Sequence, residues 1–482
     1  MTAHVTAMIV AIGLFATLLS PARAQAAGAI GVRYSTSADT VRIVLDLPAA
    51  VTYTDLSTPQ QVQVSLDWPL AEAAPVITVD DSIAASIALA PDANGRALLT
   101  VTLKKARKFT LFTLKPDGRK PDRLVVDIHK RFRTETVRAL SPAITHTRIE
   151  QQTDTEYRHV HFIEADLQDP HLRVGVAAAE GERERVSEMV ARTGAVCGIN
   201  AGYFMQGTRP VGLLKADGRL LAMPLWGRTA VAFSPTGGPV FGNPKGAWRV
   251  TLPDGSERDL PDWLDASVLI PPPAAVAYNG NLFTQVPANA NGLTALIQGG
   301  KVVLRSTEVV PLLPGDLALR LLGDEAKALD ALLAMDAPVT VTPLLEPAWE
   351  TYLHAVGAGP RLLQNGQPSI TGQEERFKPD VLLGRNARSG LGVTQHGTLV
   401  LVAVEGPSPY GGGATLEELA GLLKSRRAVD ALNLDGGGSS TLAIGAETVN
   451  VRPGSWIRPV ASGILLFDDR VQTKAVEPAS AE

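Results

Sequence analysis

The sequence of 482 residues has little of several features that would define its class at once. It contains a single cysteine, Cys197, so an intramolecular disulfide is excluded. Aromatic residues make up 5%, which argues against a module built mainly of sugar-stacking platforms. The net charge of -4 gives no sign of the basic surface that is typical of nucleic-acid binders. We therefore expect no nucleic-acid partner.

Motifs for a transition metal are also lacking. The eight histidines form no His-x-x-x-His or Cys/His pattern. His159 and His161 share one face of an expected strand, but two ligands without a third are a weak metal signal. Cys197 lies in the short apolar run 195–199, where we expect it to be a small buried hydrophobe.

The N-terminus has the pattern of an export signal. A short apolar run over residues 7–19 precedes Ala-Arg-Ala at 22–24, and Ala-x-Ala is typical of a cleavage site. The run is too short to cross a bilayer comfortably. Residues 1–7 contain no Lys or Arg, which keeps a membrane anchor or a wrongly assigned start codon as the alternatives. We expect residues 1–24 to be a signal peptide. The mature protein is then expected to be periplasmic or secreted and associated with the envelope, with no stable membrane span after cleavage.

Residues 28–131 read as an all-β domain. Hydrophobic residues at 45% and charged residues at 20% are an ordinary globular balance, and the length allows two or three domains. Apolar and polar residues alternate at 41–46, 62–66, 98–103 and 124–128, with turn residues between these runs. Period-two alternation without an amphipathic helix predicts a small β-sandwich.

Two of these runs carry a resemblance. Residues 41–46 (Val-Arg-Ile-Val-Leu-Asp) and 121–128 (Pro-Asp-Arg-Leu-Val-Val-Asp-Ile) resemble an AMIN domain. Such modules occur on periplasmic proteins and are associated with the cell envelope. The resemblance implies that peptidoglycan or another envelope polymer is a partner of residues 28–131. An unrelated β-sandwich is the alternative.

The rest of the chain alternates irregularly between strands and helices. Three arginines and a proline predict a linker over residues 132–144. Residues 145–468 then have the pattern of an α+β domain with a mixed sheet, and residues 469–482 that of a disordered tail. Thr415 and Glu418 have the spacing of a helix capping box. Expected strands lie at 172–176, 195–199, 338–341, 398–404, 429–434 and 460–467, and expected helices at 182–192 and 324–335.

A run of glycine and serine follows the apolar strand 429–434, directly after Asp435. Glycines let a backbone turn sharply and approach a ligand closely, and consecutive amides can form an anion-binding nest. The alternative is a plain hairpin turn, but three glycines cost more backbone entropy than such a turn requires. We expect Asp435 to be catalytic and the following residues to bind substrate or phosphate: Gly436, Gly437, Gly438, Ser439 and Ser440.

Other strand ends carry further candidates. Asn200 suits a sugar hydroxyl or acetamido group, and Tyr203 follows in the same segment. Arg388 and Arg458 offer the fork geometry that suits phosphate. Glu405 directly follows an apolar strand. The alternatives are an ordinary turn asparagine, solvated arginines and an exposed carboxylate.

Together these segments match one family in order. They are 200–204, 354–360, 388–392, 415–419, 434–440 and 458–460. Residues from about 145 to 468 thereby resemble the phosphodiester glycosidases, of the N-acetylglucosamine-1-phosphodiester α-N-acetylglucosaminidase (uncovering-enzyme) type. The motif Asp-Gly-Gly-Gly-Ser-Ser at 435–440 is the most specific part of this resemblance. The resemblance implies a hydrolase that cleaves a sugar-1-phosphodiester bond, with a phosphate-linked envelope or capsular glycan as substrate.

Glycoside cleavage usually employs two carboxylates, and we expect Asp435 and Glu405 to be that pair, with nucleophile and acid or base unassigned. A phosphate leaves as an anion, so fixed positive charge from Arg388, Arg458 and the turn amides matters more than proton donation. We expect no required cofactor. A divalent cation, Ca²⁺ or Mg²⁺, held by Asp435 and Glu405 stays open, because hard cations prefer oxygen ligands.

Two other functions stay open. One is a non-catalytic envelope protein that binds a glycan phosphate. The other is a peptidoglycan amidase, because AMIN domains often accompany amidases. An amidase needs a zinc site of His and Glu, and the sequence gives no convincing set of three ligands.

Overall fold

The structure is a computed structural model that describes residues 29–180, 183–205, 210–225, 227–234, 238–262, 273–450 and 456–471. The expected signal peptide lies outside these residues, as does most of the expected tail. None of the described helices has the length and apolar character needed to cross a membrane. The chain divides into two compact units, and the first holds residues up to 134, 150–157 and 408–411.

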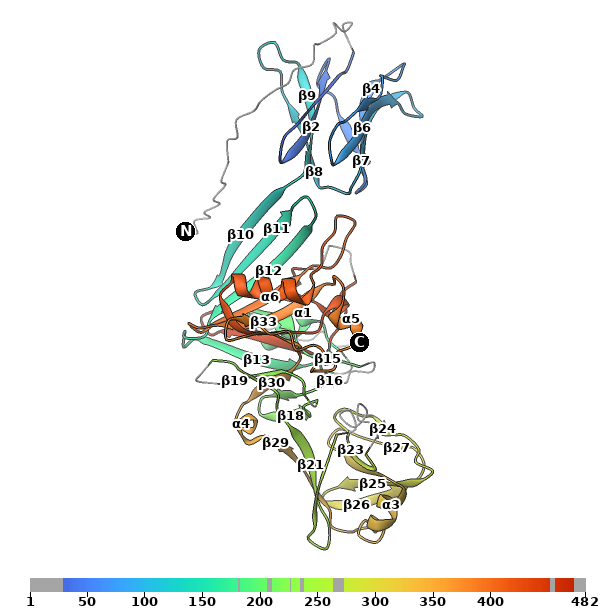
Figure 1. Cartoon of the computed structure of the whole chain (residues 1–482), viewed down its shortest axis with the longest axis vertical. Helices are drawn as coiled ribbons and strands as arrows, with labels where there is room; N and C mark the ends of the chain where they lie inside the picture. Colours follow the sequence, from blue (N-terminus) through green and yellow to red (C-terminus); the bar gives the residue numbers. More distant parts are fainter. Residues whose placement is uncertain are drawn as a thin grey trace, which may run out of the picture. The chain divides into compact units, whose positions relative to one another are not determined.

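Most of the first unit is a β-sandwich whose two sheets share one hydrophobic core (Figure 1). Alternate residues of each strand point inward, as Val41, Ile43 and Leu45 do, and all three are fully buried. The predicted sandwich is therefore confirmed. One sheet contains β1 (Gly31–Thr36), β2 (Thr40–Leu47), β9 (Asp122–His129) and β8 (Phe109–Leu114), and the other β3 (Tyr53–Asp55), β4 (Gln61–Pro69), β7 (Arg96–Leu103), β6 (Ala84–Pro91) and β5 (Ile77–Thr78).

The second unit is built on an eight-stranded sheet. Its order is β10 (Phe132–Ser141), β11 (Ile144–Gln152), β12 (Tyr157–Asp166), β34 (Thr398–Val404), β33 (Arg388–Thr394), β35 (Ala428–Asn433), β31 (Arg361–Gln364) and β32 (Gln367–Pro368). One face packs against α6 (Leu416–Ser425). Thr415 Oγ accepts the Glu418 amide while the Glu418 carboxylate accepts the Thr415 amide, which confirms the capping box.

The expected linker is wrong, because residues 132–141 form the edge strand β10 of this sheet. Most of its residues are exposed on both faces, so β10 lacks the apolar alternation that marks a half-buried strand. The expected tail also begins later than residue 469, since Arg470 forms ion pairs with Asp169 and Asp468.

The other face of the eight-stranded sheet packs against a second sheet, and both contribute to the largest core cluster. This second sheet contains β13 (Leu172–Ala178), β38 (Ser462–Asp468), β14 (Cys197–Asn200), β36 (Leu442–Ile444) and β37 (Glu447–Thr448). Cys197 is buried in it, as expected. α1 (Val186–Thr193) is shorter than the expected helix 182–192 and ends at Gly194, which has a left-handed φ of 72°.

A third sheet also contributes to this core, and a small hairpin follows β14 in the chain. The sheet contains β18 (Arg219–Ala222), β17 (Leu214–Ala216), β30 (His354–Gly357), β19 (Ala230–Phe233) and β20 (Val240–Gly242). The hairpin pairs β15 (Tyr203–Phe204) with β16 (Pro210–Val211). Two short helices, α4 (Pro347–Glu350) and α5 (Pro379–Leu382), follow later in the chain.

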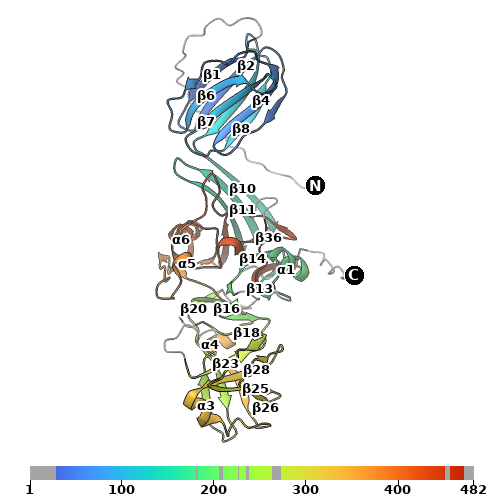
Figure 2. The same ribbon diagram turned by 90° about the vertical axis from the view of Figure 1, so that its right-hand side faces the viewer.

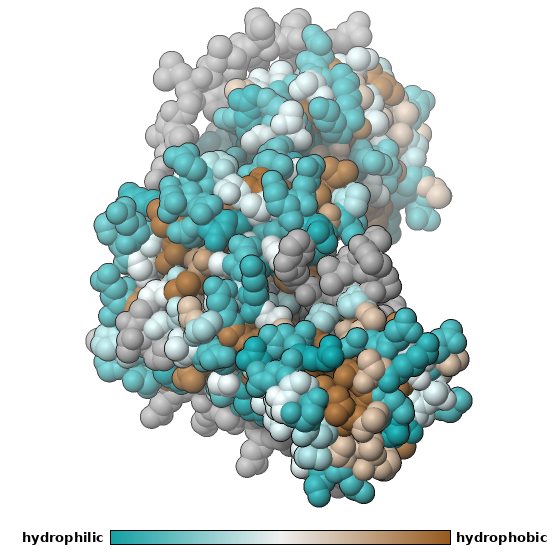
Figure 3. Space-filling model, turned by 60° about the horizontal axis from the view of Figure 1, so that its bottom comes forward, coloured by the Kyte–Doolittle hydropathy of each residue, from teal (hydrophilic) through white to brown (hydrophobic). Residues whose placement is uncertain are grey.

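Residues 246–345 form an insertion that supplies most of a further core cluster, while other residues of it, such as Val276 and Tyr278, belong to the largest core cluster (Figure 2). Its helix α3 (Gly323–Leu329) is shorter than the expected helix 324–335. Figure 3 shows apolar surface gathered on this insertion, where Val303, Leu304 and Leu313 are exposed. Its strands are β21 (Gly246–Thr251), β22 (Glu257–Leu260), β23 (Ala275–Asn279), β24 (Gln285–Val286), β25 (Gly292–Gln298), β26 (Lys301–Ser306), β27 (Val310–Pro311), β28 (Leu317–Leu322) and β29 (Thr340–Leu345).

These elements confirm the α+β class, with strands far outnumbering helices. The strand pairings with a described register are antiparallel, including β12 with β34 and β33 with both β34 and β35. A parallel bridge joins Asp262 to Ala277. The sheets are thus more uniformly antiparallel than the expected mixed sheet.

Candidate active site

The Asp435 turn begins where β35 leaves the eight-stranded sheet. The Leu434 amide donates to the Ser389 carbonyl, and the Asp435 amide donates to the Ala201 carbonyl, which belongs to the segment after β14. A 3₁₀ turn, η1 (Gly437–Ser439), follows, and Gly437 has a φ of 59° that favours glycine. Two sheets therefore fix the position of this turn.

Asn200 is a brace for this turn rather than a sugar ligand. Its side-chain Nδ2 donates to the Asp435 carbonyl at 2.7 Å. Its Oδ1 accepts from Ser389 Oγ at 2.7 Å and from the Thr441 amide at 3.0 Å. The side chain is fully buried, so these contacts take three of its four hydrogen-bonding positions. The structure thus contradicts the expected sugar contact.

Asp435 is only partly exposed, and burial raises the pKa of its carboxyl to about 6. Ser439, the Gly436 amide and the charge of Arg458 all oppose this shift without cancelling it. Burial of the Tyr203 phenol raises its pKa, and the negative charge of the neighbouring Asp435 adds to this shift. A carboxyl group that titrates near pH 6 is suited to proton transfer at neutral pH.

The amides of the turn do not form the expected anion nest. The Gly437 amide donates to the Ala387 carbonyl at 2.8 Å, and those of Ser439 and Ser440 donate to carbonyls within the turn at 3.2 Å. These three amides are therefore unavailable to a phosphate. The hydroxyl of Ser440 and the Asn433 Oδ1 atom are buried without a hydrogen-bond partner among the described residues. Such clustered atoms indicate a place for polar substrate groups or water.

Arg388 and Arg458 differ in what they contact. Arg388 is buried and donates to the backbone carbonyls of Ala414, Val381 and Gly384 at 3.1, 3.0 and 3.3 Å. It braces the chain behind the turn, which contradicts its expected role at the phosphate. Arg458 instead lies against the turn: a Cβ added at Gly438 would come within 3.1 Å of the guanidinium carbon. Gly438 is therefore required for this approach.

The structure adds a second cation that the sequence did not indicate. The Arg228 guanidinium lies 3.5 Å from the centroid of the Phe377 ring. Burial lowers the pKa of Arg228, while the nearby Tyr203 and Glu375 oppose this shift. Arg228 occurs in no motif, so only the fold places it beside Tyr203.

Two groups hold this side of the site in place. The Tyr203 hydroxyl donates to the Gly359 carbonyl at 3.0 Å and accepts from Asn433 Nδ2 at 2.8 Å. The buried Glu375 carboxylate accepts from the Thr229 amide at 2.8 Å and from the Arg361 amide at 2.9 Å. Tyr203 thus lies at the site, where its contact with substrate stays a prediction, and Glu375 is a structural carboxylate next to Arg228.

Glu405 does not join Asp435. The strand β33 separates β34 from β35, so the ends of these two strands are about 10 Å apart at two strand spacings. Glu405 Oε1 instead lies 2.5 Å from His159 Nδ1 and 3.8 Å from His161 Nε2. Burial alone would raise the pKa of Glu405, but the two histidines outweigh it and lower it to about 2. Among the described residues, no contact supports the expected carboxylate pair or a cation shared by both.

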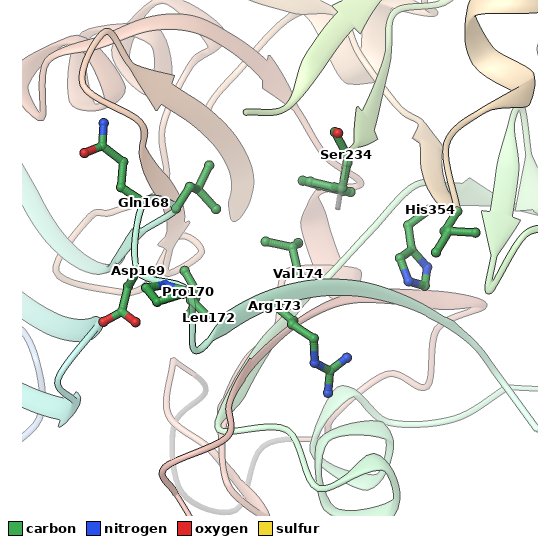
Figure 4. A pocket seen from close by; sticks show the side chains of 11 residues that line it. Gln168, Asp169, Pro170, Leu172, Arg173, Val174, Ser234 and His354 are labelled. Atoms are coloured by element: carbon green, nitrogen blue, oxygen red, sulfur yellow. The ribbon is translucent and has the colours of Figure 1, made fainter. Parts of the chain in front are cut away.

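The pocket in Figure 4 lies elsewhere, with a volume of about 370 Å³ between the turn before β13 and the residues flanking β19 and β30. None of the candidate residues lines it. Asp169 at its edge pairs with Arg470 at 2.8 Å, and His354 Nδ1 accepts from the Val176 amide at 3.3 Å. Asp169 and Arg173 do not converge in Figure 4. Asp169 and His354 of this pocket therefore stabilise the fold through contacts within the protein.

The sequence model of the phosphodiester glycosidase family matches residues 193–467, more than half of the chain. The protein therefore belongs to this family, and the match contains the Asp435 turn, Arg228 and Arg458. No curated protein matches the sequence significantly.

Solved structures show where the fold recurs. A hypothetical protein from Synechocystis has a TM-score of 0.64 and 21% identity over 91% of this chain and 80% of its own. A candidate exported protein from Burkholderia pseudomallei K96243 has a TM-score of 0.51 and 17% identity over 92% of this chain and 100% of its own. At these identities the likeness is one of fold alone.

Proposed function

We propose that the protein is a hydrolase that cleaves the bond between the anomeric carbon of a sugar and a phosphodiester. The observation that carries this proposal is the Asp435 turn: a carboxyl group with a pKa of about 6 lies beside Arg458 inside the family match. Water supplies the hydroxyl group that binds the anomeric carbon. The phosphate leaves with the electrons of the broken C–O bond, and one proton from water is released.

Each group has a distinct part in this reaction. Asp435 faces the sugar, where it acts as proton acceptor or as nucleophile. Arg458 and Arg228 supply fixed positive charge for the departing phosphate, in place of Arg388 and the turn amides. Tyr203 and Phe377 lie beside Arg228, with their ring centroids 5.4 Å apart, and the buried Phe377 ring holds the Arg228 guanidinium in place.

The proposed setting is the cell envelope. The β-sandwich of residues 28–131 is AMIN-like and binds peptidoglycan or another envelope polymer, and the substrate is a phosphate-linked envelope or capsular glycan. Export follows cleavage after Ala24 or Ala26 at the Ala-x-Ala patterns. N-terminal sequencing of the secreted protein checks this step, and a mature chain that still begins at Met1 would refute it.

One observation favours a second candidate, a glycan-phosphate binding protein without catalysis. Glu405 is engaged by histidines and Glu375 by backbone amides, so neither of these described carboxylates serves Asp435 as the second carboxylate that most glycosidases have. A site with two arginines and one carboxylate also suits binding alone.

A release assay separates the two candidates. Purified wild-type protein and the variant Asp435→Asn are incubated with GlcNAc-1-phosphodiester model substrates, with and without EDTA, and free GlcNAc is measured. The matched control is Asp324→Asn, which alters an exposed carboxylate of α3. Turnover by wild type and control, but not by Asp435→Asn, supports the hydrolase. Saturable binding without release in all three supports the binding protein.

A further inference from the structure

Three potential metal ligands converge at the ends of two neighbouring strands, away from the Asp435 turn. His159 and His161 lie two positions apart on β12, so both side chains point to the same face of the sheet. Glu405 directly follows β34, and its amide donates to the His159 carbonyl at 3.0 Å. The ligand atoms of the three side chains all lie within 4.8 Å of one another.

His161 offers the clearest sign that the group is incomplete. Its ring is 2% exposed, and its Nε2 atom has no hydrogen-bond partner among the described residues. This atom points toward Glu405 Oε1 at 3.8 Å, which is too long for a hydrogen bond. A buried ring nitrogen without a partner is costly, and a bound ion would satisfy it.

We propose that His159, His161 and Glu405 bind a divalent first-row transition ion, with Zn²⁺ as the best match. Two imidazole nitrogens and one carboxylate oxygen suit Zn²⁺ better than Ca²⁺ or Mg²⁺, which prefer oxygen ligands only. Bonds of 2.0–2.2 Å place tetrahedral ligand atoms about 3.3 Å apart. The His159–Glu405 contact therefore opens by roughly 1 Å and His161 moves closer by a smaller amount.

The surrounding groups define what must change when the ion binds. His161 Nδ1 lies 3.0 Å from His146 Nε2, so His146 can orient the His161 ring as a ligand partner. Arg148 Nε donates to His159 Nε2 at 2.7 Å, so the His159 proton is on Nδ1. This N–H group donates a hydrogen bond to the Glu405 carboxylate. Binding replaces that proton with the ion. His159 Nε2 is then protonated, and the exposed Arg148 side chain moves into solvent.

The site is open on one side. The His159 and Glu405 side chains retain 10% and 14% exposure, whereas His161 is enclosed. Three protein ligands leave a fourth position for water or a substrate oxygen, which is the arrangement of zinc sites that bind exchangeable ligands. This inference does not depend on the proposed glycosidase activity.

Zinc titration of the untagged full chain tests the inference. After removal of metal with EDTA and dialysis, we expect isothermal calorimetry to give one high-affinity Zn²⁺ per chain. His161→Asn and Glu405→Gln should each weaken binding by more than the about 10–100-fold loss that follows removal of a second-shell partner. His396→Asn, which changes an exposed histidine in a turn, is the matched control and should bind like wild type.

Two further measurements keep the test independent of folding. Circular dichroism must show that the variants remain folded, and Co²⁺ should give visible d–d absorption in wild type that His161→Asn loses. Arg148→Gln should bind Zn²⁺ at least as tightly as wild type, since it removes a competing donor and a positive charge. Absence of a high-affinity Zn²⁺ in wild type would overturn the inference, as would equal affinity in wild type, His161→Asn and Glu405→Gln.

Discussion

Asp435 and Glu405 each lie within two residues of the end of a strand of the same sheet, yet the structure gives them opposite surroundings. Asp435 lies in a tight turn where burial dominates, and its pKa rises to about 6. Glu405 lies against His159 and His161, which lower its pKa to about 2. The two carboxylates look alike in the sequence, so the comparison shows that the neighbouring strand determines the chemistry of a strand end.

The neighbours differ because of strand order. β35 adjoins β33 and β31, so Asp435 meets a braced backbone, buried hydroxyls and Arg458. β34 adjoins β12, whose histidines occupy the facing positions beside Glu405. Asp435 is therefore suited to proton transfer, and Glu405 to binding a cation or a protonated imidazole.

The largest expected effect is the loss of turnover when Asp435 is replaced, and it tests the difference between the two carboxylates. Asp435→Asn keeps the shape of the side chain and removes its charge, so we expect turnover of a GlcNAc-1-phosphodiester to fall by about 10²- to 10⁴-fold. Glu405→Gln should lower turnover by a clearly smaller factor. Steady-state kinetics on both variants at saturating substrate make the measurement, and equal losses would end the distinction between the two carboxylates.

A second pair of variants separates the arginines. Arg458→Ala should lower turnover of the phosphodiester by about 10²- to 10³-fold, the effect of one lost electrostatic donor. The loss should shrink on an aryl glycoside, which has no phosphate to stabilise. An equal loss on both substrates would remove Arg458 from the phosphate.

Arg388→Ala should act on stability instead. It leaves three backbone carbonyls without their donor, of which that of Ala414 is buried, so we expect the free energy of unfolding to fall by about 2–4 kcal/mol. Urea denaturation of both arginine variants gives the comparison. Wild-type stability in Arg388→Ala would contradict its role as a brace.

The pH dependence of stability should have opposite signs at the two carboxylates. The folded pKa of Asp435 lies above its ordinary value of 3.8, so its stabilising contribution is present at low pH and is lost as pH rises toward about 6. The folded pKa of Glu405 lies below 4.5, so its contribution is present above that pH and is lost toward about 2. Differences in unfolding free energy between wild type and Asp435→Asn or Glu405→Gln, measured in EDTA, should therefore slope in opposite directions.

The smallest effect on turnover should come from removing the sandwich. A chain that begins at Phe132 keeps β10 and all residues placed at the Asp435 turn. We expect it to hydrolyse a soluble substrate and to lose binding to isolated cell walls. A folded truncated protein without turnover would show that the sandwich belongs to the active site.

Local patterns account for the elements that the sequence predicted well. The capping box at Thr415, the strand 398–404 and the C-terminal glycine of α1 depend on neighbouring residues, and all three are present. β10 was missed because both of its faces are exposed. The insertion at residues 246–345 was not recognised, since a contiguous pattern does not show which strands share a cluster.

The sequence by itself determined the family and the α+β class, because these depend on contiguous motifs and on periodicity, and it predicted a catalytic role for Asp435. Only the tertiary structure decided the partners of each charged group. In the structure, Arg388 and Asn200 hold the backbone near the Asp435 turn through hydrogen bonds. Arg228 lies near Tyr203, and Glu405 lies beside two histidines from a distant part of the chain. Strand order and register set these contacts, and long-range pairing leaves no local signal in the sequence.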